Sequence, residues 1–146
     1  MKIKFAKNGN LHDSQTLTYG EFKKAFGFNE SRIEKIKRIL IFLKILKSLK
    51  CTSVYIVGSF VSIKEFPNDI DICVDATGID YVELLKEYPD FLESKGIEKI
   101  KKEHYVHFAA FFDFGSPEIL DWFKKDRDGN PRGLVKMYLK DIDDYD

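Results

Sequence analysis

Two aspartates separated by one residue offer the clearest chemical signal in the chain. Asp69 and Asp71 flank Ile70, and Ile72 and Val74 continue the alternation of apolar residues. In an extended strand, residues i and i+2 project from the same face, about 6–7 Å apart. Both carboxylates should therefore point one way, whereas the apolar side chains enter a core. Two such carboxylates can share divalent cations, because these cations prefer hard oxygen ligands.

A Gly-Ser pair stands ten residues before this acidic pair. Gly58 and Ser59 follow the apolar run 54–57. A Gly-Ser turn that opens a helix offers backbone N–H groups and a hydroxyl to an anion such as a phosphate. A phosphate cradle beside a metal-binding carboxylate pair is suited to nucleotidyl transfer. The stretch 57–74 is therefore predicted to hold such a site.

A third carboxylate, Asp113, lies within the run Phe111-Phe112-Asp113-Phe114, where the pattern predicts no polar side chain. An unpaired buried charge costs several kcal/mol, so a buried Asp113 would need a partner. A metal shared with Asp69 and Asp71 would supply one. The alternative is an acid at a strand end that faces water or a nearby lysine. Acids near turns are common and most are only solvated.

Three basic residues are candidates for contacts with phosphate: Lys64, Arg127 and Arg132. For any one of them, a solvated surface cation is the simpler interpretation. Asp128-Gly129 lies between the two arginines and predicts a tight turn.

The elements that position these residues can be predicted from capping signals and periodicity. Thr18 and Glu21 form a capping box that predicts a short helix over 18–26. A second box headed by Ser31 opens a longer helix over 31–50. The apolar positions of that helix recur every three or four residues: Ile33, Ile36, Leu40, Leu43 and Leu46.

Short apolar segments predict strands at 1–5, 54–57, 69–74, 105–114 and 134–139. Asp80 caps a further helix that Pro89 should end, and Ser116 caps the last one. The tail, residues 141–146, has four acids and is expected to fray. The fold class predicted is α/β (α+β), with a mixed sheet flanked by helices.

The chain is predicted to be one domain, 1–146. It divides into a helical N-terminal part (1–50), a catalytic sheet core (51–140) and the acidic tail (141–146). Its 146 residues are 44% hydrophobic and 33% charged, which is typical of a globular protein rather than a disordered one.

The two cysteines, Cys51 and Cys73, have no metal-ligand spacing and give no disulfide framework. The most apolar run, 39–49, contains lysines and is too short to span a bilayer. We therefore expect no leader and no membrane partner, and a reducing cytoplasm as the location.

The net charge of zero hides an uneven distribution. Residues 1–50 carry 12 Lys or Arg and 4 Asp or Glu, whereas residues 51–146 carry 12 and 20. The simpler interpretation is that a basic helix face complements an acidic remainder within one fold. The alternative is an electropositive surface for a nucleic acid or another acidic partner.

The stretch VGSFVSIKEFPNDIDICVD resembles the nucleotidyltransferase signature of the DNA polymerase β superfamily. That signature has a Gly-Ser pair, about ten residues, an Asp-x-Asp and a later acid on another strand. More narrowly, the chain is similar to a family of small bacterial nucleotidyltransferase-like proteins of unassigned function. The flanking segments NGNLHDSQTLTYGEFKKAFGFNESR and FKKDRDGNPRGLVKMYL carry this second resemblance, which spans nearly the whole chain.

The resemblance implies a nucleotidyltransferase fold and a role for each matching residue. Gly58 and Ser59 would bind the triphosphate, with Lys64 as a further nucleotide contact. Asp69 and Asp71 would hold two Mg²⁺ (or Mn²⁺). Asp113 would complete the site of the metal that activates the acceptor. In such two-metal sites the ions lie ~3.5–4 Å apart and stabilise the attacking and leaving oxygens.

Three functions remain open at this point. The first is an enzyme that moves a nucleoside monophosphate from an NTP, with ATP as the expected donor, to a hydroxyl of a protein, an RNA end or a small molecule. By analogy, such an enzyme would belong to a toxin–antitoxin or defence module with a cognate partner protein. The second is a non-catalytic module of the same fold that neutralises a partner. The third, a metal-dependent glycosyltransferase, also uses Asp-x-Asp but does not require the Gly-Ser pair and normally needs a longer chain.

Overall fold

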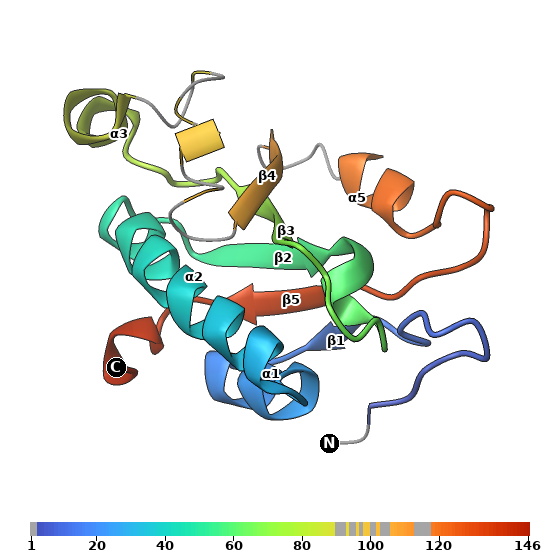
Figure 1. Ribbon diagram of the computed structural model, residues 1–146. Coiled ribbons are helices and arrows are strands. Elements are labelled where there is room, and N and C mark those ends of the chain that lie inside the picture. Colours follow the sequence, from blue (N-terminus) through green and yellow to red (C-terminus); the bar gives the residue numbers. More distant parts are fainter. Residues whose placement is uncertain are drawn as a thin grey trace.

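In a computed structural model, the described residues are 3–89, 93, 96, 98, 99, 102, 106–112 and 118–146, with the backbone alone described over 106–112. Among them, five strands form one mixed sheet in the order β1-β5-β2-β3-β4. Helices lie on both sides of this sheet (Figure 1). The prediction of a mixed sheet flanked by helices is therefore confirmed.

The strands are short, and their directions alternate only in the centre of the sheet. Their bounds are Gln15–Thr16 (β1), Ser53–Val57 (β2), Ile70–Asp75 (β3), Val106–Phe112 (β4) and Val135–Tyr138 (β5). The central strand β2 pairs antiparallel with β3 and β5, whereas β1 with β5 and β3 with β4 are parallel pairs. The two edges are thus parallel pairs and the centre is antiparallel.

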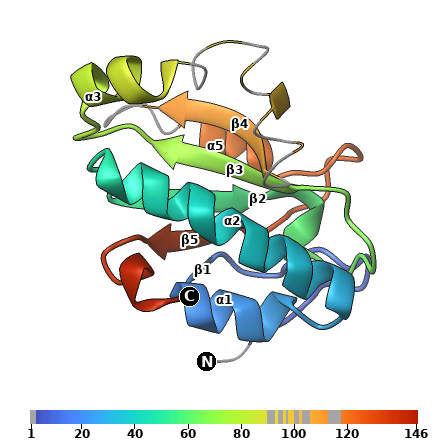
Figure 2. The same ribbon diagram turned by 60° about the vertical axis from the view of Figure 1, so that its left-hand side comes forward.

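Two helices cover one face of the sheet, which we call the helical face. They are α1 (Tyr19–Phe26) and α2 (Glu30–Ser48), and α2 runs across the strands in Figure 2. Four of the five predicted apolar positions of α2 are buried: Ile36, Leu40, Leu43 and Leu46. They pack against Val54, Ile56, Ile70, Ile72, Val74, Val135 and Met137 of the sheet.

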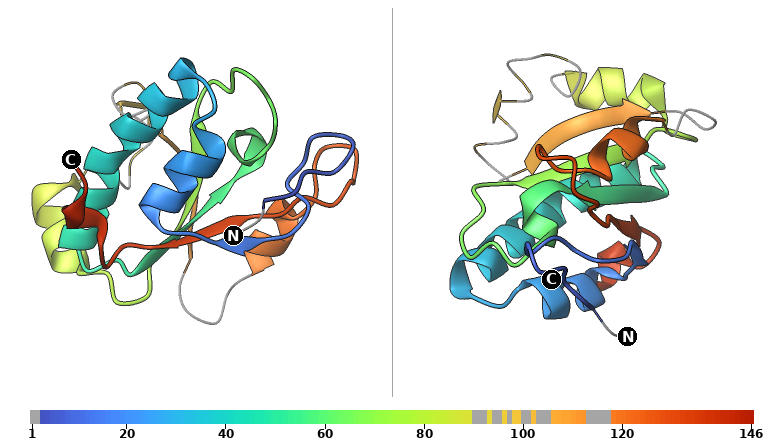
Figure 3. Two further views of the ribbon diagram at one scale, coloured as in Figure 1. Left: turned by 90° about the horizontal axis from the view of Figure 1, so that it is seen from below. Right: turned by 90° about the vertical axis from the view of Figure 1, so that its right-hand side faces the viewer.

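The opposite face, which we call the second face, is covered by the short helix α5 (Glu118–Phe123). Figure 3 shows α5 on the side of the sheet away from α1 and α2. Leu120 of this helix packs with Val57, Cys73 and Leu134. The helix α3 (Tyr81–Glu87) follows β3 at the end of the sheet farthest from α1 (Figure 1).

The helix caps agree with the sequence in two cases and differ in one. Both hydrogen bonds of the Thr18–Glu21 capping box are formed, at 3.0 and 3.1 Å. The Asp80 side chain accepts a hydrogen bond from the Glu83 backbone N–H, as predicted. The prediction for α2 was wrong, because Asn29 rather than Ser31 is its N-cap. Asparagine is among the best capping residues, so the helix begins two residues earlier.

Two other predictions about the termini were wrong. Within 3–5 there is no strand, and Phe5 makes only an isolated bridge with Leu11. The chain turns at residues 6–10 and forms its first strand, β1, later. The tail does not extend into solvent, because Ile142 is buried and the segment Ile142–Asp144 forms a 3₁₀ helix against α2.

Within the described ranges, no helix combines the length and apolar character needed to cross a membrane.

Candidate functional site

The Gly-Ser corner and the acidic pair meet at the end of β2. Val57, the last residue of β2, is the register partner of Asp71 on β3. Gly58 then turns the chain with φ +77°, and a Cβ on Gly58 would lie only 2.5 Å from Oδ2 of Asp71. The carboxylate therefore lies directly against the corner, in a space that only glycine leaves open.

The acidic pair lies at the start of β3. Ile70 and Ile72 are fully buried on the helical face, so the alternation of the strand directs Asp71 to the second face. Asp69 is the residue immediately before β3, and both aspartates are partly exposed. The arrangement offers hard oxygen donors at the surface, backed by an apolar core.

The Gly-Ser pair opens a single 3₁₀ turn, Gly58–Val61, rather than an α-helix. Ser59 is partly exposed on this turn, next to Gly58. Lys64 lies farther along the same loop with an exposed side chain. These predicted nucleotide contacts thus follow one another along one loop beside Asp71.

The register of β4 places a histidine position beside the acidic pair. His107 is the register partner of Asp71, and Phe112 is the partner of Asp75. Asp113, which follows Phe112, lies outside the described residues, so its part as a third metal ligand stays a prediction. Among the described residues, no group of three or more His, Cys, Asp or Glu side chains is placed to hold a metal. The sequence indicated His107 only as a strand residue, because the pairing of β3 with β4 is a long-range choice.

A buried arginine, which the sequence did not single out, holds the loop after the corner. Arg32 is fully buried and donates five hydrogen bonds to backbone carbonyls. The distances are 2.8 Å to Phe60, 2.9 Å to Ser62, 2.7 and 3.0 Å to Lys64, and 2.9 Å to Phe26. Arg32 therefore ties the N-terminal turn of α2 to the loop that carries the Gly-Ser pair.

Aromatic rings complete the surroundings of this guanidinium. Its carbon atom lies 4.2 Å from the ring centroid of Phe28 and 4.5 Å from that of Phe60. Burial lowers the pKa of Arg32 to about 10, so the group remains cationic at neutral pH. Ring faces and carbonyl oxygens both attract a cation, and together they stabilise the buried charge of Arg32.

The same loop is also held by a turn at residues 6–10, in which the Gly9 backbone N–H donates to the Ala6 carbonyl at 2.9 Å. The Ile63 backbone N–H donates to the Gly9 carbonyl at 3.0 Å. The Asn10 side chain donates to Asp126 at 3.0 Å, and this bond is the largest cause of the lowered pKa of that carboxyl. The corner is thus held between α2 on one side and two surface turns on the other.

The remaining basic candidates lie away from the corner loop in sequence. Arg127 is exposed in the turn that begins at Asp126. Arg132 is partly buried, its backbone N–H donates to the Lys124 carbonyl at 2.8 Å, and its Nε has no hydrogen-bond partner among the described residues.

The two cysteines are free and buried, as the sequence predicted when it gave no disulfide framework. Burial raises the pKa of Cys51 and of Cys73 to about 12, and the nearby Asp71 carboxylate adds to the effect on Cys73. Both thiols are therefore protonated at neutral pH and act as small apolar side chains.

Comparison with known proteins returned no match among the curated proteins and none among the solved structures. The relation to the DNA polymerase β superfamily therefore stays a prediction. Residues 3–138 match a family of unknown function, DUF6932. Since this match spans most of the chain, the protein belongs to the family of unknown function DUF6932.

Proposed function

We propose that the protein is a metal-dependent nucleotidyltransferase. It transfers a nucleoside monophosphate from an NTP, with ATP as the expected donor, to a hydroxyl of a protein or RNA acceptor. The observation that carries this proposal is the direct approach of Gly58 to the Asp71 carboxylate. A phosphate held by the corner would lie beside the carboxylate, which is where a bridging cation is needed.

The residues at the corner fit a divalent cation. Asp69 and Asp71 supply hard oxygen donors, and the Asp71 carboxylate lies against the backbone of Gly58, in the space that a side chain there would fill. These two residues would hold Mg²⁺ or Mn²⁺, with Asp113 as the predicted third ligand. When bound, the metal supplies charge neutralisation for the triphosphate and favours ionisation of the acceptor hydroxyl.

The chain itself contributes binding and orientation. Gly58 and Ser59 contact the triphosphate through backbone N–H groups and a hydroxyl, and Lys64 adds a cation on the same loop. The acceptor oxygen attacks the α-phosphorus and forms a new P–O bond. The bond from that phosphorus to the β-phosphate oxygen breaks, pyrophosphate leaves with the electron pair, and the hydroxyl proton passes to solvent. Such chemistry depends on positioning and charge more than on covalent catalysis.

Labelled nucleotides test the proposal directly. The protein is incubated with each α-labelled NTP, Mg²⁺ or Mn²⁺, and a lysate that supplies protein and RNA acceptors. We expect label in a macromolecule with the wild type and at least about a 100-fold loss in Asp69→Asn and Asp71→Asn, the scale of removing one electrostatic contact to a transition state. Asp113→Asn tests the third ligand by the same loss.

Asp75→Asn is the matched control. Asp75 lies on the same strand, but its carboxylate accepts hydrogen bonds from Ser53 and from the Thr77 backbone instead of facing the corner. This variant should keep transfer. Melting temperatures of the Asp69 and Asp71 variants should stay near that of the wild type, because removing clustered like charges does not harm the metal-free fold. Equal labelling by wild type and Asp71→Asn would refute the proposal. Tight binding of a partner protein without label from any NTP would instead indicate a non-catalytic module that neutralises its partner.

A further inference from the structure

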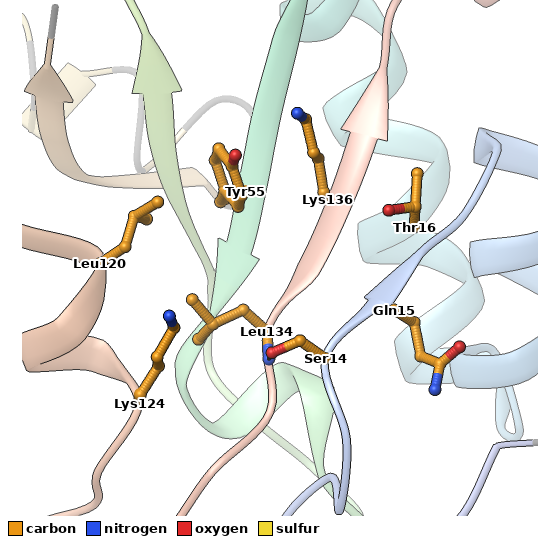
Figure 4. A pocket seen from close by; sticks show the side chains of 8 residues that line it. All are labelled: Ser14, Gln15, Thr16, Tyr55, Leu120, Lys124, Leu134 and Lys136. Atoms are coloured by element: carbon orange, nitrogen blue, oxygen red, sulfur yellow. The ribbon is translucent and has the colours of Figure 1, made fainter. Parts of the chain in front are cut away.

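A pocket with a volume of about 260 Å³ opens on the second face, between β1, β5, β2 and α5 (Figure 4). Its apolar lining residues are Leu120 of α5 and Leu134, next to β5. Tyr55, Lys124 and Lys136 also line it. The proposed transferase site does not use any of these residues.

The charged groups of the pocket are all cationic. The described residues that line it include two lysines and no carboxylate. Lys124 forms an exposed contact of 3.4 Å with Asp121, and exposed pairs of this kind contribute little. Figure 4 shows the two lysine side chains on either side of the pocket, with Tyr55 and Leu134 between them.

Aromatic rings hold Lys136 in place. Its ammonium nitrogen lies 4.7 Å from the ring centroid of Tyr138 and 5.6 Å from that of Tyr55. Ser14 and Thr16 add hydroxyl groups at the β1 side. A ligand with an apolar or aromatic body and a phosphate would find a matching surface for each part here.

The pocket lies close to the proposed metal site on the same face of the sheet. Tyr55 precedes Val57 by two residues on β2, and Val57 is the register partner of Asp71. From the rise per residue and the spacing of strands, the Cα atoms of Tyr55 and Asp71 lie roughly 8 Å apart. A bound molecule of nucleotide size could therefore reach from one site to the other.

We propose that this pocket binds the phosphate group of the acceptor, with Lys124 and Lys136 as its cationic contacts. The phosphate belongs either to the terminal nucleotide of an RNA or to a small phosphate ester, which would then be the acceptor in place of a protein or RNA, since both present the same chemistry. The term acceptor rests on the proposed function, whereas phosphate binding itself needs neither metal nor NTP.

Binding is measured by ¹H–¹⁵N correlation NMR in EDTA, which removes metal from the acidic corner. The probes are inorganic phosphate, adenosine 5′-monophosphate and a short single-stranded RNA with a free 3′ hydroxyl. We expect saturable shifts at Tyr55, Thr16 and Lys136. The dissociation constant should rise at least about 10-fold in Lys124→Met and in Lys136→Met, because each loses a charge-assisted hydrogen bond.

Lys86→Met is the matched control, since Lys86 is exposed on α3, away from the pocket. It should leave the dissociation constant unchanged. Lys136→Arg, which keeps the positive charge and its N–H donors, shows whether a loss in Lys136→Met reflects charge or packing. Shifts that do not saturate, or that change equally in Lys86→Met, would overturn the proposal.

The probes also distinguish the two sources of phosphate. RNA binding at least about 10-fold tighter than that of the monophosphate assigns the pocket to an RNA end, and equal affinity assigns it to a small ester. Saturable binding without transfer of label from any NTP would support phosphate binding in the pocket and refute the proposed transferase function. If the lysine variants transfer label with an unchanged KM for the acceptor, the pocket proposal alone is refuted.

Discussion

Gly58 has an unusual backbone conformation and also lies against a carboxylate of the candidate site. Its φ of +77° lies in the left-handed region, which costs a residue with a Cβ roughly 1–2 kcal/mol. The Cβ would also lie 2.5 Å from Oδ2 of Asp71, so the carboxylate would have to move. A side chain at this position thus affects both stability and the proposed site.

Replacement of Gly58 by alanine separates these two effects when it is compared with Gly129→Ala. Gly129 has a φ of +80°, and a Cβ there would meet no atom within 4 Å. Both variants should lose roughly 1–2 kcal/mol of unfolding free energy in urea from the backbone alone. Only Gly58→Ala should lose more than this and also lose NMP transfer. Transfer activity that Gly58→Ala retains in full would show that the corner does not serve the reaction.

At the scale of elements, the loop from Gly58 to Asp69 depends on α2 for its shape. The carbonyls of Phe60, Ser62 and Lys64 all accept hydrogen bonds from the Arg32 guanidinium. The planar group has five N–H donors in a fixed geometry, whereas a lysine has three on one nitrogen. One side chain of α2 therefore sets the path of the segment between the two halves of the candidate site.

Loss of this guanidinium should be severe. Arg32→Met leaves several buried carbonyls without donors, and each costs about 1–3 kcal/mol, so we expect a destabilisation of at least about 3 kcal/mol in urea unfolding. Arg32→Lys should recover only part of it. Arg38→Met is the control on the same helix, where the 3.7 Å contact with Glu34 is exposed and worth about 0.3–0.5 kcal/mol. Similar losses of unfolding free energy in the Arg32 and Arg38 variants would contradict the role of Arg32 in holding the loop.

At the scale of the whole molecule, the acidic tail neutralises part of the basic N-terminal half. Lys47 on α2 pairs with Asp143 at 2.7 Å and donates to the Lys140 carbonyl at 3.0 Å. The Tyr145 ring lies edge-on to Tyr19 with centroids 4.9 Å apart. These contacts support the simpler interpretation of the charge distribution, in which the basic helix and the acidic remainder complement each other within the fold.

Ile142 anchors this tail, so Ile142→Ala should cost about 2–4 kcal/mol of unfolding free energy through the loss of buried apolar contacts. Asp144→Asn, an exposed change in the same 3₁₀ helix, should cost less than about 0.5 kcal/mol. Thermal or urea unfolding measures both. An Ile142→Ala protein as stable as the wild type would mean that the tail frays, as the sequence alone predicted.

The sequence by itself determined the elements whose signals are local. The capping box of Thr18, the cap at Asp80 and the apolar alternation around Asp71 each depend on residues within a few positions of one another. The Gly-Ser pair and the aspartates could be predicted to meet for the same reason, since a short loop between two strands leaves few alternatives. The mixed sheet with flanking helices follows from the order of these elements.

Tertiary structure alone decided the partners that are distant in the chain. Arg32 donates to carbonyls about 30 residues away, and the tail packs on a helix about 100 residues away. The pairing of β3 with β4 makes His107 the register partner of Asp71. No local sequence pattern encodes these contacts. They form because buried polar groups must find hydrogen-bond partners and exposed apolar side chains must be buried when the core assembles. The position of the Asp71 carboxylate against Gly58 depends on both local sequence and tertiary structure. The turn at Gly58 is local, and the distant Arg32 holds the loop that follows it.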